Sequence, residues 1–471
     1  MKVQALALLA LLAACDDGDP QEPTREDFGT LDQGGMGGEG GAGGAGGGET
    51  DTHLRLSFIK AFTPPDGVAR QDLVVYDFED GEAFNLTADG GVDCNSKTCL
   101  LNGSMTWVGW MERADGGGFT LWVAPVDVKR KLVRTAEKRQ VDESVNSFDF
   151  TTSEGTDLIL YTKGQAIGAE RTIEVLVEPV AGPDAACPLP ETPERCSQFV
   201  GNINADGGFR VTPFGSLIII IKTTLSTMTL DFFNVKNGAN QTLYTFGEQG
   251  GTGSQFSGRL PVALSPDATY LAVFTRNEFI WRAQTLQAIP NPPPAQTKDL
   301  FEAANSQDEN GMPNDCRRQM PYEFNEVRFN PVFSADGEFF YFLAKGDCTK
   351  RAGESNRDDY DILRFDRAMS GDPVNVSNNV RASHWSNHDF GDFALDPAGE
   401  RLAFTASRPN NAISRSIWII NPANGEYDCS GEAKSHTDLN GGTRCEYIFD
   451  DTAGATVSYR DLRFHQVEVP R

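Results

Sequence analysis

The sequence predicts an all-β fold in which repeated hairpins stack into a ring or a solenoid. One unit recurs at 264–274, 333–342 and 395–404, as an apolar run, a turn rich in Pro, Asp and Gly, and a second apolar run. Short alternating or apolar strands also recur from His53 onward, without long helical periodicity. Because one hairpin cannot bury its own faces, the copies are expected to pack against one another.

A second repeated unit alternates with these hairpins. It is an apolar pentamer followed by Asp and Gly, and its clearest copy runs from Leu73 through Asp77 and Gly81 to Thr87. Six related copies begin at Leu121, Ile173, Leu230, Phe279, Asp361 and Ser416. Weaker copies of the first unit lie at 153–161 and 214–221. Since the units alternate, one repeat is four antiparallel strands, and about seven repeats fit the chain.

The paired units resemble a known repeat. Ser-Pro-Asp-Ala-x-x-Leu-Ala-x-Phe from Ser265 to Phe274, with Asp-Ile-x-x-Phe-Asp from Asp361 to Asp366, resembles the WD-like repeat of TolB-type β-propellers. This resemblance implies a β-propeller of about seven four-stranded blades over residues 53–471. TolB proteins carry an α/β domain before the propeller, which this chain lacks, so their role in the Tol-Pal system is not carried over. The alternative is an open sandwich or a β-solenoid.

The two ends of the repeat region indicate how the ring closes. The strand at 54–62 has no preceding hairpin of its own, and residues 456–469 form a strand-like tail without a hairpin partner. We expect one or both segments to complete a shared blade, because closure removes exposed sheet edges.

The N-terminus predicts export and a lipid anchor. Lys2 precedes an apolar stretch too short to span a bilayer, ending in Leu12-Ala13-Ala14-Cys15. This ending resembles the lipobox of bacterial lipoproteins, which implies removal of residues 1–14 as a signal peptide and lipidation of Cys15. An ordinary secretory signal is the alternative. The expected location is the bacterial cell envelope, with inner and outer membrane both open.

Residues 15–52 are acidic and then glycine-rich, which is typical of a flexible tether. The whole chain of 471 residues carries a formal charge of -26. This acidity disfavours nucleic acid and anionic lipid surfaces as partners, because phosphate binding depends on clusters of Lys and Arg.

The chain has nine cysteines, and eight remain when Cys15 is set aside for the lipid. An even number of cysteines in an exported chain favours disulfides over metal ligation. Eight cysteines allow about a hundred connectivities, which stay open. The simplest pairs sequence neighbours: Cys94 with Cys99, Cys187 with Cys196, Cys316 with Cys348, and Cys429 with Cys445. Zinc is not favoured, because the chain has no C-x2-C pair.

In a four-stranded blade, the turns within the two units lie on one face and the longer connections lie on the other. We expect all four cysteine pairs on the second face, where stapled loops would concentrate binding residues. The start of each inner strand points to the central channel, so the predicted binding residues at the channel mouth are Asn146, Asn325, Glu326, His388 and Asp389. Solvated loop ends or capping side chains are the alternative.

The sequence contains no clear metal-binding motif and no clear catalytic motif. His384 and His388 have metal-ligand spacing but lie in an expected loop, and the calcium-like run from Asn202 to Gly207 has Pro213 where the closing Glu should stand. The sequence contains no G-x-S-x-G, no G-x-x-x-x-G-K-[ST] and no strand-linked G-x-G-x-x-G, since the glycine tract is read as a tether. The prediction is therefore no cofactor and no catalytic residue, with calcium or another divalent metal as the alternative.

These observations predict a non-catalytic cell-envelope lipoprotein whose propeller binds a protein or another ligand. Its partners would be the membrane, through the lipid anchor, and envelope proteins or polysaccharide. The rival is a propeller enzyme acting on polysaccharide, either a glycosidase or a metal-dependent enzyme like the related oligogalacturonate lyases, to which no residue set can be matched. A purely structural envelope component is a third reading.

Overall fold

A computed structural model describes most of the chain between Thr50 and Pro470. The described residues are 50–63, 67–88, 91–95, 98–115, 117–153, 155–164, 173–182, 198–203, 208–211, 217–223, 228–235, 238, 240–246, 262–266, 271–273, 280–283, 296–299, 332–345, 360–366, 374–376, 392–408, 411–431, 433–437, 443–450 and 455–470. They belong to one compact unit, Gly47–Arg471. The cleaved signal and most of the tether predicted above lie outside them.

β-strands are the main secondary structure of the described residues and are joined by turns and loops, as the alternating patterns predict. The one helical element within the described ranges is a single turn of 3-10 helix, Thr135–Glu137. No helix in the same ranges is long and apolar enough to cross a membrane.

Both ends of the chain contribute to one sheet, which we call the closing sheet. Its order is β3 (Glu82–Asn85), β2 (Arg70–Asp77), β1 (Thr50–Thr63) and β30 (Thr456–Pro470). β1 and β30 pair antiparallel along almost their whole length, from Thr50 opposite Pro470 to Thr63 opposite Thr456. The prediction that the two ends share a blade is confirmed.

The next sheets follow in chain order. The first contains β4 (Cys99–Leu101), β5 (Trp107–Arg113), β6 (Phe119–Asp127) and β7 (Leu132–Val133), with β8 (Arg139–Asp142) also on β6. The second contains β9 (Val145–Ser153), β10 (Thr156–Lys163), β11 (Ile173–Pro179) and β12 (Gln198–Ile203). The third contains β13 (Gly208–Val211), β14 (Leu217–Thr223), β15 (Met228–Asn234) and β16 (Asn240–Phe246).

Two strand pairs and two larger sheets complete the described part. The pairs are β17 (Val262–Leu264) with β18 (Leu271–Val273), and β19 (Ile280–Ala283) with β20 (Gln296–Asp299). One sheet contains β21 (Val332–Phe333), β22 (Phe339–Lys345), β23 (Tyr360–Asp366) and β24 (Val374–Asn375). The other has the order β25 (Phe393–Leu395), β26 (Leu402–Arg408), β27 (Asn411–Ile420), β29 (Thr443–Ile448) and β28 (Lys434–Thr437).

The repeats occupy equivalent places in these sheets. The three clearest hairpins are β17–β18, β21–β22 and β25–β26, and the weaker copies are β9–β10 and β13–β14. Apolar pentamers form the third strand of their sheets, as in β6, β11, β15, β23 and β27. The hairpin β4–β5 was not predicted, because Asn102-Gly103-Ser104 replaces the usual turn sequence.

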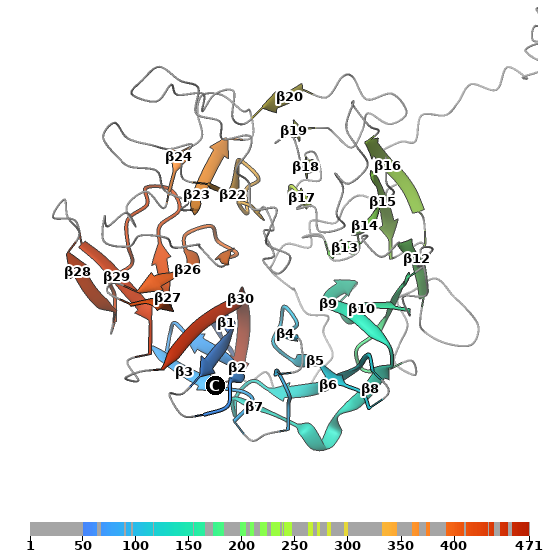
Figure 1. Cartoon of the computed structure of the whole chain (residues 1–471), viewed down its shortest axis with the longest axis horizontal. Helices are drawn as coiled ribbons and strands as arrows, with labels where there is room; N and C mark the ends of the chain where they lie inside the picture. The colour runs from blue at the N-terminus through green and yellow to red at the C-terminus, as the bar shows by residue number, and fades with distance from the viewer. Residues whose placement is uncertain are drawn as a thin grey trace, which may run out of the picture. The chain divides into compact units, whose positions relative to one another are not determined.

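Apolar clusters between successive sheets form the core. The closing sheet packs on β4–β8 through Ile59 and Trp110, and β4–β8 packs on β9–β12 through Leu121 and Phe148. On its other side the closing sheet packs on β25–β29. Within this unit the sheets follow one another around a common centre (Figure 1), with β30, β4, β9 and β13 as inner strands. The fold is an all-β propeller.

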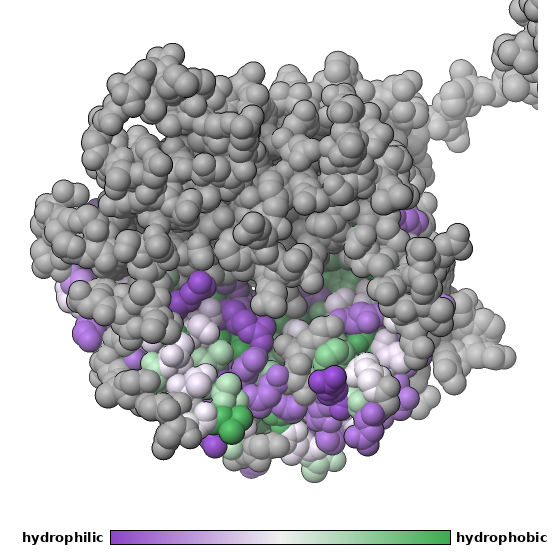
Figure 2. All heavy atoms as spheres, viewed as in Figure 1, coloured by the Kyte–Doolittle hydropathy of each residue, from purple (hydrophilic) through white to green (hydrophobic). Residues whose placement is uncertain are grey.

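The alternating strand directions define two faces. The turn face carries the β2–β3, β4–β5, β21–β22 and β25–β26 turns, and the loop face carries the connections from β1 to β2 and from β3 to β4. Viewed down the shortest axis, the described part shows many hydrophilic residues over the closing sheet and β4–β8 (Figure 2).

Candidate functional site

One of the predicted channel-mouth residues lies in the described part. Asn146 stands at the start of β9, as expected, and its Nδ2 donates a hydrogen bond to the Gly164 carbonyl at 3.1 Å. The side chain thus bridges the two ends of the β9–β10 hairpin. Outside the described residues lie Asn325, Glu326, His384, His388, Asp389, Cys15 and the cysteines 187, 196, 316 and 348.

A charged pair spans the inner strands of two sheets that are not neighbours. Arg463 of β30 donates to Asp149 of β9 through Nη1 to Oδ1 at 2.7 Å and Nη2 to Oδ2 at 3.3 Å. The β4–β8 sheet packs between the closing sheet, which supplies Arg463, and the β9–β12 sheet, which supplies Asp149. The forked contact therefore joins strands across the inner side of the ring, in the geometry that makes guanidinium–carboxylate pairs strong.

A β-bulge places further charges beside this pair. The β1–β30 register shifts between Ser57 and Ile59, where Asp461 adopts a left-handed φ of 57°. Arg460 Nη1 donates to Asp461 Oδ2 at 2.7 Å. Bulges of this kind re-aim side chains and recur beside functional sites.

Asp392 completes the group, just before the inner strand β25. Its Oδ2 accepts the backbone N–H of Leu462 at 2.9 Å, which ties β25 to the bulge in β30. We call Asp149, Asp392, Arg460, Asp461 and Arg463 the centre cluster. Burial alone would lower the pKa of Arg463, but the carboxylates of Asp149, Asp461 and Asp392 raise it, so this guanidinium stays charged.

The sequence carries a partial signal for this cluster. Asp392 lies three positions after the predicted Asp389, at the start of an inner strand, where residues are expected to face the channel. Asp149 stands between Phe148 and Phe150, so a carboxylate on the alternate face of an inner strand was a usable signal. Arg463 carried no such signal, because its position depends on the pairing of the two chain ends.

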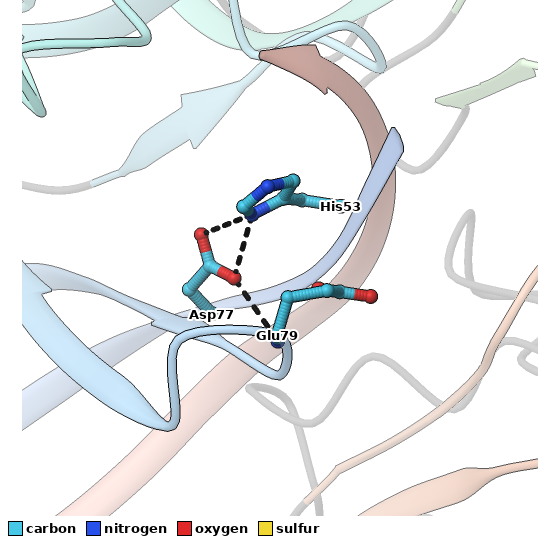
Figure 3. A group of neighbouring side chains, drawn as sticks. All are labelled: His53, Asp77 and Glu79. Atoms are coloured by element: carbon cyan, nitrogen blue, oxygen red, sulfur yellow. Dashed lines mark hydrogen bonds and ion pairs between the residues drawn. The ribbon is translucent and has the colours of Figure 1, made fainter. Parts of the chain in front are cut away.

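A second polar group lies at the turn face of the closing sheet (Figure 3). Ligating atoms of His53, Asp77 and Glu79 lie within 4.8 Å of one another, a spacing that could suit a metal ion. The His53 ring nitrogen Nδ1 lies 3.0 Å from Asp77 Oδ1, and Glu79 Oε2 accepts the Leu54 N–H at 2.8 Å.

The surroundings of Asp77 do not suit a cation. Arg55 Nε donates to Asp77 Oδ2 at 2.7 Å, and both side chains are buried. Burial would raise the pKa of Asp77, but the hydrogen bonds from Arg55 and His53 outweigh it and lower the pKa. A metal ion at this carboxylate would meet the Arg55 guanidinium, so the group is an ion pair with a capping histidine.

Two of the predicted disulfides are present. Cys94–Cys99 lies in the β3–β4 connection on the loop face, as expected. Cys429–Cys445 also forms, but its predicted place was wrong. Cys445 lies within β29, and Cys429 follows Asp428, whose carboxylate lies 3.7 Å from Arg401 in the β25–β26 turn. This bridge belongs to the turn face, because the β27–β29 connection joins the third and fourth strands of its sheet, as the β2–β3 turn does in the closing sheet.

Comparisons with known proteins give fold-level similarity alone. No family model and no curated protein matches the chain. Similar solved structures include the β-propeller domain of the trilobed protease from Pyrococcus furiosus, at 8% identity and TM-score 0.42, covering 84% of this chain and 96% of that one. A protein from Lactobacillus plantarum is 12% identical, with a TM-score of 0.43, and the match covers 86% of this chain and 99% of that one. A variant of puromycin hydrolase is 13% identical, with a TM-score of 0.45, and the match covers 83% of this chain and 56% of that one.

Proposed function

We propose that this protein is a lipid-anchored cell-envelope lipoprotein with a TolB-type propeller that serves as a non-catalytic binding module. The observation that carries the binding role is the centre cluster, where charged side chains from β9, β30 and the start of β25 meet at the inner side of a closed ring. Polar groups held by strands at a ring centre are suited to recognise a polar ligand without rearranging. The lipobox ending at Cys15 supports the anchor.

The hydrogen bonds of the cluster favour recognition over chemistry. Asp149 accepts from Arg463, Asp392 accepts from the Leu462 amide, and Asp461 accepts from Arg460. A general acid or base needs a pKa tuned near the working pH and access to a substrate proton. The carboxylates of this cluster are instead held in place by guanidinium and amide donors, an arrangement that suits the binding of a polar partner.

The binding role is tested with full-length protein in detergent and purified envelope polysaccharide. We expect polysaccharide to be retained without release of fragments, with retention at least about tenfold weaker for Arg463→Met. Asp115→Asn, an exposed change on the loop-face β5–β6 connection, is the control and should bind normally. Release of unsaturated or reducing fragments would replace this proposal by the polysaccharide-enzyme reading, and absence of retention would leave proteins as the ligands to test.

The anchor is tested separately. Globomycin, which blocks the lipoprotein signal peptidase, should cause an unprocessed precursor to accumulate, and Cys15→Ala should move the protein from the detergent to the aqueous phase. Normal processing in globomycin would exclude lipidation at Cys15 while leaving the binding role intact.

A further inference from the structure

Four aromatic side chains meet on the turn face, at the boundary between the closing sheet and the β25–β29 sheet. The ring centroids of Tyr76 and Phe78 lie 5.1 Å apart, and those of Tyr76 and Tyr447 lie 5.4 Å apart. Phe78 also lies 5.6 Å from Tyr447 and 5.9 Å from Phe464. We call these four rings the aromatic patch. All four are partly exposed, whereas Leu56 and Phe58 of the same cluster are fully buried.

The patch is held in a fixed arrangement. Tyr76, Phe464 and Tyr447 lie on β2, β30 and β29, and the Phe78 N–H donates to the Leu54 carbonyl at 3.0 Å. The Cys429–Cys445 bridge ties β29 to the segment beside Arg401. Little side-chain freedom remains to be lost when a partner binds, which favours affinity.

The protein itself already places a cation on this patch. The Arg401 guanidinium carbon lies 4.9 Å from the centre of the Phe78 ring, within the range of cation–π attraction. Its Nε lies 3.7 Å from an oxygen of Asp428. The Arg401 guanidinium thus lies between an aromatic face and a carboxylate. The side chains of Arg401 and Asp428 are both partly exposed.

The charges around the patch favour a positive partner. Glu79 follows Phe78 and is exposed, with one carboxylate oxygen fixed by the Leu54 N–H. Asp428 lies on the other side. The net charge of -26 attracts cations at longer range and repels polyanions.

We propose that the aromatic patch docks a basic segment of a partner protein, with a Lys or Arg side chain taking the place of Arg401 against Phe78. This inference rests on the proposed binding function and assigns it a partner class and a second surface. Removal of the competing Arg401 guanidinium should therefore tighten binding, and removal of the Phe78 ring should weaken it. The opposite signs of these two effects distinguish docking from general attraction to an acidic protein.

The test uses full-length protein and fluorescein-labelled Gly/Ser peptides that carry four Lys and Arg residues, with Gln-substituted peptides for comparison. Fluorescence anisotropy at physiological salt gives the dissociation constants. Phe78→Leu keeps apolar volume and charge, and should weaken binding of the basic peptide roughly fivefold to tenfold. Arg401→Gln should tighten it by about threefold to fivefold. Arg113→Gln, which changes net charge equally at an exposed loop-face position, is the matched control.

Each outcome decides the proposal. Equal effects of Arg401→Gln and Arg113→Gln would mean that net charge alone attracts the peptide, and would overturn it. So would normal binding by Phe78→Leu, once its melting curve shows that it is folded. The polysaccharide-retention assay is also run on Phe78→Leu. If this variant loses retention of the polysaccharide but binds the basic peptide normally, the patch is a glycan site instead. Release of polysaccharide fragments in the earlier assay overturns the binding-module proposal but does not alter these peptide constants.

Discussion

The two sides of the closing sheet are built differently. Alternate residues of β1 face opposite neighbours: Leu56 and Phe58 face the β25–β29 sheet, and Arg55 and Ser57 face the β4–β8 sheet. The apolar seam on the first side contains Val74, Ala403, Ile417, Ile419 and Tyr459. The polar seam on the second side sets Arg55, Ser57, Asp77 and His465 beside Ile59 and Val75.

The polar seam is not arranged for maximal stability. Arg55 and Asp77 are paired at 2.7 Å, but Arg55 Nη1 and Nη2 are buried and make no hydrogen bond within the described part of the chain. His465 Nε2 lies 2.8 Å from Ser57 Oγ, and its Nδ1 lies 3.3 Å from the Gly103 carbonyl of the β4–β5 turn. Apolar packing holds the closing sheet to its neighbours on both sides, and the polar seam in addition fixes which residues of β1, β30 and the next sheet lie opposite one another.

The largest effect should come from removal of the strand that both seams share. Deletion of residues after 453 removes β30, which supplies Tyr459 to the apolar seam and His465 to the polar seam. Because β1 would become an unpaired inner edge, we expect loss of cooperative unfolding or insoluble protein. Circular dichroism melting measures this, with Gln466→Ala as an exposed control in the same strand. An unchanged melting curve would contradict closure of the ring by β30.

The next test compares one residue from each seam. Phe58→Ala should cost about 3–5 kcal/mol of unfolding free energy by leaving a cavity. Asp77→Ala should cost a similar amount, because Arg55 is left buried and unpaired. The double variant Arg55→Met/Asp77→Leu should recover most of that loss, since no charge remains buried. Urea denaturation measures all three. A double variant as unstable as Asp77→Ala would show that the polar seam supplies stability and not only register.

The seams also show what the sequence could predict. The hairpin turns and apolar pentamers predicted β21–β23 and β25–β27, because local turn chemistry and period-2 patterns are visible in the sequence. Nothing local in the sequence marks Arg55 and Asp77 as partners. They meet because β1 and β2 pair in one register, Arg55 opposite Asp77, and such register is set by pairing over the whole sheet. The centre cluster and the aromatic patch depend on contacts between sheets distant in sequence, so they were beyond local reasoning.

The polar seam should make stability depend on pH in a way that the apolar seam cannot. Burial, with the nearby charges of Arg463 and Arg55, lowers the pKa of His465 to about 4 from 6.5. The unfolded state therefore takes up a proton first as the pH falls, and stability drops between about pH 6.5 and 4, by about 3 kcal/mol in all. Asp77, whose pKa is lowered, adds a further loss only below its ordinary value of 3.8.

Urea midpoints at pH 7.5, 5.5 and 4.5 measure this dependence. His465→Gln should remove most of the slope between pH 7.5 and 4.5, whereas Gln466→Ala, an exposed change that removes no titratable group, should leave it unchanged. A slope that persists in His465→Gln would assign the pH dependence to other groups.

The smallest effects should come from the disulfides, one beside each seam. Cys94 and Cys99 are buried in the polar seam and close a separation of 5 residues, whereas Cys429–Cys445 lies beside Tyr447 and closes 16. Loop-closure entropy predicts losses of about 2 and about 3 kcal/mol for the two alanine pairs, measured by urea denaturation. The single change Cys429→Ala breaks the longer cross-link at an exposed position and leaves the buried Cys445 in place. Its effect on stability therefore measures the cross-link without the loss of a buried side chain. A larger loss for Cys94→Ala/Cys99→Ala would mean that the two buried sulfurs outweigh loop closure, and that the polar seam depends on packing as much as the apolar one.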